Sequence, residues 1–372
     1  MILNALSITM IFIGVISSLL AIWGGISSFI LYRKWERSSA PEEKSSLEDR
    51  SYLVLLIMVI VLMIRLINWP LFYVTLQSFI PDIEGAMCIF GVTQVKPGLT
   101  HFLEFLKPIN FFLIGGWFIL HILDRATKTS PLMRRKFSLL SIISLTVLID
   151  SIGDILLIFG ITPESLVSCC TTVVDISSRP TRTSPESIFG PEYAQSLQVL
   201  FFFTHLSLMG FIGVTLKSKI FRRPILDSYT LKSENLSLTF SKKLPLPLPA
   251  GERGRVRGNF KYLWLGLLFL FSLLNAILFL LSQIEVFAPR MMNLPFHHCL
   301  YCLWQYVPDS ILMFSFFILG TFSVGWGFTT DLFGKIGEAS DLLPDYIRKI
   351  YWFAFFFLSA SLMMLIIHLL VD

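Results

Sequence analysis

Residues 263–282 read LWLGLLFLFSLLNAILFLLS, an apolar run in which Asn275 is the one strongly polar residue. An α-helix needs about 20 apolar residues to cross the hydrocarbon core of a bilayer, at about 1.5 Å per residue. The run lies in the sixth of eight such segments: residues 5–31, 52–78, 108–123, 137–160, 195–216, 262–284, 309–329 and 350–370. They predict an all-α integral membrane protein, a polytopic bundle of about eight transmembrane helices with short Cys-rich outer loops.

The composition favours the same class of protein. Of 372 residues, 54% are hydrophobic and only 15% are charged, against roughly 25% charged in a typical soluble domain. The first apolar run continues to Tyr32 and follows an N-terminus without positive charge. It is too long for the apolar core of a signal peptide, so we expect a retained first helix. Residues 1–372 are predicted to form a single polytopic membrane domain.

The basic residues predict the orientation of the helices. Loops 32–51, 124–136, 217–261 and 331–349 hold 24 of the 30 Lys and Arg residues, and loops 79–107, 161–194 and 285–308 hold five. These two sets alternate along the chain. Because Lys and Arg concentrate in cytoplasmic loops, we expect both termini outside the cytoplasm, in a bacterial inner membrane. The lipid bilayer is thus the first expected partner.

The longest cytoplasmic loop contains an unusual segment, residues 225–258, with alternating Pro and Leu followed by Gly and Arg. Such a composition cannot build an apolar core and predicts a disordered insert. The basic residues of the chain lie between apolar segments and are not interleaved with aromatic residues, so nucleic acid is not an expected partner.

Five cysteines are the most informative polar residues. The stretch FHHCLYC, residues 296–302, places two imidazoles and two thiols within six residues, and the predicted topology puts all five cysteines on the outer side. Thiolate and imidazole suit copper(I) or zinc, and C-x-x-C lets two sulfurs reach one ion. The candidate metal ligands are Cys88, Cys169, Cys170, His297, His298, Cys299 and Cys302, with thioethers nearby at Met87, Met291 and Met292.

Two other interpretations remain open. The first is a thiol–disulfide relay that passes oxidising equivalents between a periplasmic protein and a membrane quinone; its layout resembles that of the disulfide-generating membrane oxidoreductases, which are smaller bundles. The second is a non-catalytic membrane subunit whose disulfides join the outer loops. An odd number of cysteines leaves one thiol unpaired in any all-disulfide scheme. The metal interpretation adds a periplasmic metal carrier as a possible partner class.

Charged residues inside the predicted spans need partners, because a charge in hydrocarbon costs several kcal/mol. Arg65 lies in the second span, and Asp150 and Asp154 lie at matching depth in the fourth. A spacing of four places both carboxylates on one helix face. We expect Arg65 to pair with one or both, leaving one uncompensated negative charge. A structural ion pair is the favoured role, and a conduction or proton path is the alternative.

The remaining polar candidates are histidines and one glutamate. His205 lies near mid-depth in the fifth span, but no second histidine lies at matching depth, so haem is less favoured than copper or zinc. Histidine in such a position is more often a helix contact. His101 and Glu104 precede the third predicted span and could join the outer site. No G-x-x-x-x-G-K-[ST], G-x-S-x-G or H-E-x-x-H motif occurs, so no catalytic residues are assigned.

Overall fold

The computed structural model describes residues 4–37, 41–163, 166–167, 192–218, 250–294 and 297–371. Eight helices in this part of the chain are long and apolar enough to cross a membrane, which confirms the predicted fold class. They are α1 (Ala5–Arg37), α2 (Pro41–Ser78), α4 (Pro97–Arg125), α5 (Met133–Gly160), α7 (Tyr193–Lys217), α8 (Ala250–Ser282), α11 (Ser310–Phe333) and α12 (Ala339–Val371).

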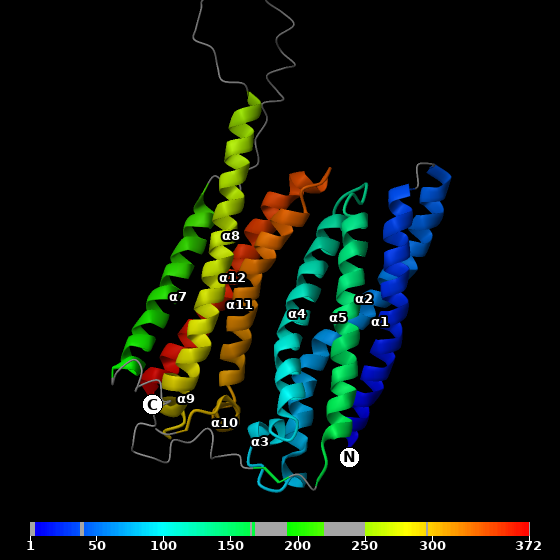
Figure 1. Cartoon of the computed structure of the whole chain (residues 1–372). Helices are drawn as coiled ribbons and strands as arrows, with labels where there is room; N and C mark the ends of the chain where they lie inside the picture. The colour runs from blue at the N-terminus through cyan, green and yellow to red at the C-terminus, as the bar shows by residue number, and fades with distance from the viewer. Residues whose placement is uncertain are drawn as a thin grey trace, which may run out of the picture.

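The long helices form two groups that lie side by side (Figure 1). One group contains α1, α2, α4 and α5, and the other contains α7, α8, α11 and α12. Helices α4 and α11 make the main contact between the groups. Both chain termini lie at the same end of the bundle in Figure 1, which we call the terminal end. An even number of spans requires this arrangement.

Short helices cover the terminal end. They are η1 (Ile80–Asp82) and α3 (Ile89–Thr93) between α2 and α4, and η4 (Gln283–Phe287), α9 (Ala288–Met291) and α10 (Leu300–Tyr306) between α8 and α11. Helices α3 and α10 pack against each other. Two connections that are distant in sequence therefore meet at one place.

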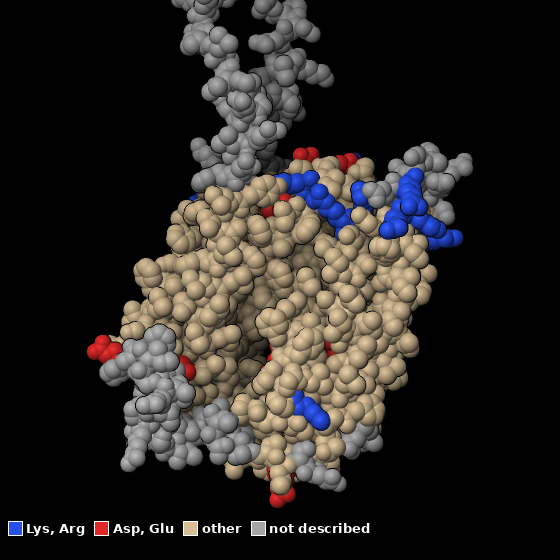
Figure 2. Space-filling view, viewed as in Figure 1, with Lys and Arg blue, Asp and Glu red and all other residues tan. Residues whose placement is uncertain are grey.

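The surface of the bundle matches a lipid environment. Large apolar side chains point outward along the helices, for example Phe12 at 66% exposed and Phe105 at 72%. Lys and Arg gather at the end opposite the termini, and the flank between the two ends carries few charges (Figure 2). This distribution agrees with the charge pattern from which the orientation is predicted.

Several helices begin well before the expected spans, α2, α8 and α12 among them, and the extension of α4 is the one that changes the candidate site. Helix α4 begins at Pro97 rather than at residue 108, and Lys107 and Pro108 lie inside it. A lysine followed by proline is typical of a helix boundary, but proline is tolerated in membrane helices when neighbours satisfy the freed backbone groups. Lys107 is therefore a buried residue rather than part of an outer loop.

The predicted insert comprises residues 225–258. Its residues up to 249 lie outside the described residues. Its remaining residues belong to the first turns of α8.

Buried ion pairs also occur near the end opposite the termini, where the sequence pattern does not single them out. Asp124 at the end of α4 contacts Lys136 of α5, with 2.5 Å between Oδ2 and Nζ. Asp331 of α11 contacts Lys261 of α8 at 2.6 Å and Lys335 at 3.0 Å. The Asp124–Lys136 and Asp331–Lys261 pairs join neighbouring helices where the basic loops begin.

A glycine permits the close contact between the two helix groups. A Cβ at Gly115 of α4 would overlap the indole of Trp326 on α11, and that indole is held by a 2.8 Å hydrogen bond from its Nε1 to the carbonyl oxygen of Phe112. At the adjacent Gly116 the nearest atom would lie 3.5 Å away, an ordinary contact.

We therefore expect Gly115→Ala to lower the melting temperature of the purified protein in detergent, at a cost of about 1–3 kcal/mol for overpacking. Gly116→Ala is the matched control and should melt at or slightly above the wild-type temperature, because alanine favours helix. Thermal unfolding followed by circular dichroism measures both. Equal melting of the two variants would contradict this account of the α4–α11 contact.

Candidate functional site

Three cysteines from two distant connections form a cluster at the terminal end. Cys88 directly precedes α3, Cys299 directly precedes α10, and Cys302 lies in the first turn of α10. The three Sγ atoms lie within 4.8 Å of one another, and those of Cys88 and Cys299 are 3.9 Å apart. This separation is almost twice the bond length of a disulfide, about 2.05 Å. We call this arrangement the three-cysteine cluster.

Local backbone structure positions the cluster. Cys88 and Cys299 have extended backbone conformations, and each begins a helical turn. The carbonyl oxygen of Cys88 accepts a hydrogen bond from the N–H of Gly91 at 3.0 Å, and that of Cys299 accepts one from Leu303 at 3.1 Å. The first turn of α10 then brings Cys302 back beside Cys299. The packing of α3 on α10 places Cys88 against both.

The cluster is buried, with Cys88, Cys299 and Cys302 only 1%, 2% and 8% exposed. Hydrogen bonds from the thiols of Cys302 and Cys88, helped by the backbone N–H groups of Cys302 and Tyr301, lower the pKa of Cys299 to about 4. The pKa of Cys302 is raised, first because its proton is shared with Cys299 and also because it is buried. Hydrogen bonding among the three thiols therefore favours a thiolate within the three-cysteine cluster.

The structure brings together only some of the predicted metal ligands. Neither His297 nor His298 belongs to the three-cysteine cluster. His298 uses Nδ1 for a 3.0 Å hydrogen bond to the carbonyl oxygen of Ile284, and His297 has a buried Nε2 without a hydrogen-bond partner. Cys169 and Cys170 lie outside the described residues. Among the thioethers, Met291 and Met292 are buried near the cysteines in one apolar cluster, whereas Met87 is 70% exposed.

A polar chain leads from the protein surface to the C-x-x-C turn. Tyr301, between the two cysteines, donates a hydrogen bond to Oε1 of Glu104 on α4. Oε2 of Glu104 lies 3.0 Å from Nδ1 of His101, whose side chain is 57% exposed. Burial and the nearby Glu104 raise the pKa of Tyr301, so the phenol keeps its proton. Tyr301 is not a residue that the cysteine and histidine pattern singles out.

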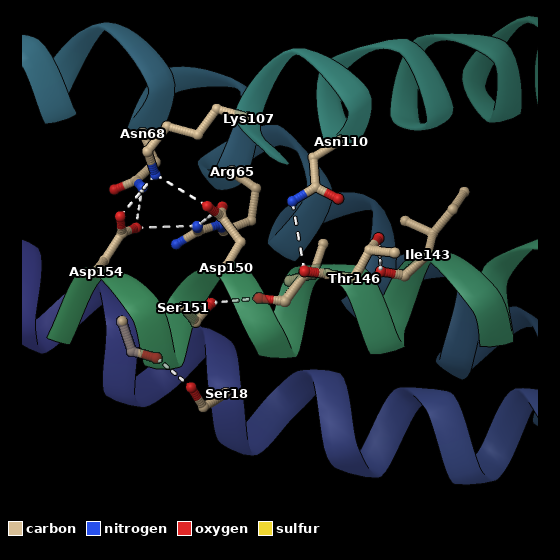
Figure 3. A network of polar contacts seen from close by, with 12 residues as sticks. Ser18, Arg65, Asn68, Lys107, Asn110, Ile143, Thr146, Asp150, Ser151 and Asp154 are labelled. Atoms are coloured by element: carbon tan, nitrogen blue, oxygen red, sulfur yellow. Dashed lines mark hydrogen bonds and ion pairs between the residues drawn. The ribbon is translucent and has the colours of Figure 1, made fainter. Parts of the chain in front are cut away.

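A second group of polar residues lies inside the bundle, between α2, α4 and α5 (Figure 3). Arg65 contacts the carboxylates of both Asp150 and Asp154. Lys107 reaches the same two carboxylates, with Nζ 3.0 Å from Oδ1 of Asp150 and 2.6 Å from Oδ1 of Asp154. Asn68 donates to Oδ2 of Asp154 at 2.8 Å. We call these five residues the intramembrane charge cluster.

Lys107 corrects the expected charge balance of this group. The sequence suggests one Arg against two Asp, with one charge left over, but the structure contains two cations and two carboxylates. All four charged side chains are at most 5% exposed. The sequence signal for Lys107 is a row of polar residues spaced by three along α4. The row is His101, Glu104, Lys107 and Asn110.

A small cavity adjoins the charge cluster. Its volume is about 10 Å³, which is room for roughly one water molecule. It is lined by Arg65, Trp69, Lys107, Asn110, Phe111, Ile114 and Asp150. Arg65 Nε and Nη1 and Asn110 Oδ1 have no protein hydrogen-bond partner. A water molecule could both accept from the guanidinium and donate to the amide oxygen, so the cavity suits a water molecule.

His205 has both ring nitrogens in hydrogen bonds. Its Nδ1 lies 3.2 Å from the amide nitrogen of Asn275 on α8, and its Nε2 lies 3.3 Å from the carbonyl oxygen of Leu358 on α12. Asn275 is also 3.3 Å from the hydroxyl of Thr204. The ring therefore joins three helices and offers no nitrogen lone pair to a metal or a haem.

Comparisons with protein-family models, curated proteins and solved structures give no match for this chain. The class of protein is therefore defined by its own fold and residues. It is an all-α integral membrane protein whose described residues contain eight helices long and apolar enough to cross a membrane, and a buried three-cysteine cluster that is compatible with a metal site.

The charge cluster yields a stability prediction. Lys107→Met leaves two carboxylates facing one cation, and breaking a buried ion pair in this way costs about 3–5 kcal/mol. We expect a large drop in melting temperature in detergent. The double variant Lys107→Met/Asp154→Asn restores the charge balance with Arg65 and Asp150, so it should recover part of the loss. If Lys107→Met melts like the wild type, the lysine does not support the bundle.

Proposed function

We propose that the protein binds a soft metal ion of the copper or zinc class through Cys88, Cys299 and Cys302. The observation that carries the proposal is the convergence of three buried sulfurs within 4.8 Å. Sulfur ligands favour copper(I), zinc and related ions over hard ions such as magnesium. Two of these ligands come from a motif that the sequence already singles out, and the third comes from a connection 211 residues away.

The distances suit such an ion. Three sulfurs bound at about 2.3 Å to one ion in a plane would lie about 4 Å apart. The 3.9 Å separation of the Cys88 and Cys299 sulfurs is close to this value. Hydrogen bonds from its thiol neighbours lower the pKa of Cys299, and an ion replaces the remaining thiol protons when it binds. A three-coordinate site in apolar surroundings suits copper(I), and zinc would need a fourth ligand.

The location of the site supports a role in transport or delivery of the ion, or in a redox reaction. The three-cysteine cluster lies at the terminal end, and the basic residues gather at the opposite end (Figure 2). Since basic residues concentrate on the cytoplasmic side, we assign the cluster to the periplasmic side of a bacterial inner membrane. A periplasmic metal carrier is the class of partner that would exchange an ion there.

The first test is the metal content of purified protein. After exposure to copper(I) or zinc under reducing conditions, the wild type should hold about one ion. Cys88→Ser should lose the ion as completely as Cys299→Ser/Cys302→Ser, because three thiolates share it. Elemental analysis measures the content. Equal, negligible copper and zinc in the wild type and all variants would refute the proposal.

A matched control uses the other two cysteines. If the three-cysteine cluster suffices, Cys169→Ser/Cys170→Ser keeps its ion. Loss of the ion in this variant would overturn the three-ligand site and extend the ligand set to residues 169 and 170.

A thiol–disulfide relay is the second candidate function, favoured by the low pKa of Cys299 at the start of a helix. Thiolates in this position of a C-x-x-C motif attack disulfides. In such a relay, Cys299 and Cys302 form a disulfide and pass two electrons and two protons to a membrane quinone. Their burial, at 2% and 8% exposed, is unfavourable for attack by a soluble partner.

Thiol trapping separates the two functions. A relay predicts a Cys299–Cys302 disulfide that forms and breaks with the redox state, and a mixed disulfide with a periplasmic protein that accumulates in Cys302→Ser. The metal proposal predicts that both thiols stay reduced and become protected from alkylation when the ion is bound. Mass spectrometry after acid quenching and alkylation measures each state. Redox cycling of the pair without protection by metal would favour the relay.

A further inference from the structure

The burial of the three-cysteine cluster raises the question of how an ion reaches it. Aromatic rings close much of its surroundings: the ring of Tyr301 packs against Tyr73 and Trp304, with 6.2 Å and 5.4 Å between ring centroids. Apolar residues of two core clusters also pack around the cysteines and Tyr301. An ion moving from water to the thiols needs polar atoms along its path, because an unsolvated charge is costly in apolar surroundings.

Glu104 and His101 provide polar atoms at this place. They lie one helical turn apart on α4 and contact each other at 3.0 Å. The side chain of His101 is 57% exposed and that of Glu104 is 21% exposed, so this pair runs from solvent into the protein. Its inner end reaches the hydroxyl of Tyr301, a residue of the Cys299-Leu300-Tyr301-Cys302 turn. The exposed imidazole of His101, the partly buried carboxylate of Glu104 and the buried C-x-x-C turn thus lie in this order from solvent inward.

We propose that Glu104 and His101 form the first-contact site for the ion, from which it passes to Cys88, Cys299 and Cys302. This inference rests on the proposed metal-binding function and adds the route to it. Imidazole is a ligand for copper and zinc, and the carboxylate beside it adds a negative charge, but thiolates bind copper(I) more strongly. Because the stronger ligands lie deeper in the protein, the ion is favoured to move from Glu104 and His101 to the three cysteines. The thiol protons released on binding leave to the surrounding water.

The negative charge of Glu104 attracts the ion before the ion contacts the protein. A carboxylate at the mouth of a low-dielectric region attracts cations and raises their association rate by about tenfold or more. It does not bind the ion in its final position, where three sulfurs hold it. Removing the charge should therefore slow loading and leave the equilibrium affinity unchanged. A residue that merely positioned the C-x-x-C turn would change both.

The experiment compares loading rates of purified full-length protein in detergent, with copper(I) supplied from a chromophoric chelator whose absorbance reports transfer. Glu104→Gln removes the charge and keeps the shape. Glu84→Gln removes an exposed charge from the connection that also carries Cys88 and serves as the matched control. Tyr301→Phe removes the hydrogen bond to Glu104 but retains its charge. Equilibrium affinity is measured for each variant by competition with the same chelator.

Glu104→Gln should load about tenfold more slowly than the wild type at low ionic strength, with unchanged affinity. Glu84→Gln should load at nearly the wild-type rate, and Tyr301→Phe, which keeps the carboxylate, should be slowed less than Glu104→Gln. Added salt should reduce the difference, because it screens the carboxylate. Equal loading of Glu104→Gln and wild type would overturn the inference. Equal loss of rate and affinity in Glu104→Gln and Tyr301→Phe would also overturn it, by showing a positioning role. A wild type that takes up no copper would instead refute the proposed function.

Discussion

The arrangement of α2, α4 and α5 depends on one electrostatic constraint, that charges buried at membrane depth must be compensated. Arg65, Lys107, Asp150 and Asp154 meet this constraint by contacting one another across three helices. Each carboxylate contacts both cations, so no helix of the three can shift alone without exposing a charge to hydrocarbon. The group is electrically neutral, and this favours a structural role over a proton path.

Helix α4 links this constraint to the candidate metal site. Lys107 is held by the two carboxylates of α5, and Glu104, one turn nearer the terminal end, is thereby held at a fixed height beside Tyr301. The same helix contacts α11 through Gly115 and Trp326. The Tyr301–Glu104 hydrogen bond thus joins the turn that carries two cysteines to the helix that carries Lys107. Lys107 and Glu104 lie at two depths of the same helix, α4, and each bonds to a different neighbour.

Sequence patterns predict the helices well because an apolar run of about 20 residues needs no knowledge of its neighbours. They fail at α4 because the burial of Lys107 depends on carboxylates 43 and 47 residues further along the chain. For the site, topology places Cys88 and Cys299 on the same side, but only the packing of α3 on α10 brings their sulfurs together. His297 and His298 are neighbours of Cys299 in sequence, yet His298 turns to the backbone of Ile284.

The three-cysteine cluster also has a consequence for biosynthesis. Cys88 leaves the ribosome long before Cys299 and Cys302, which lie 211 or more residues further along the chain. Until α10 has been made and has docked on α3, Cys88 has neither of its sulfur neighbours. The nascent protein therefore cannot form the three-cysteine cluster before its membrane insertion is nearly complete. Ion binding would then mark a fully assembled molecule.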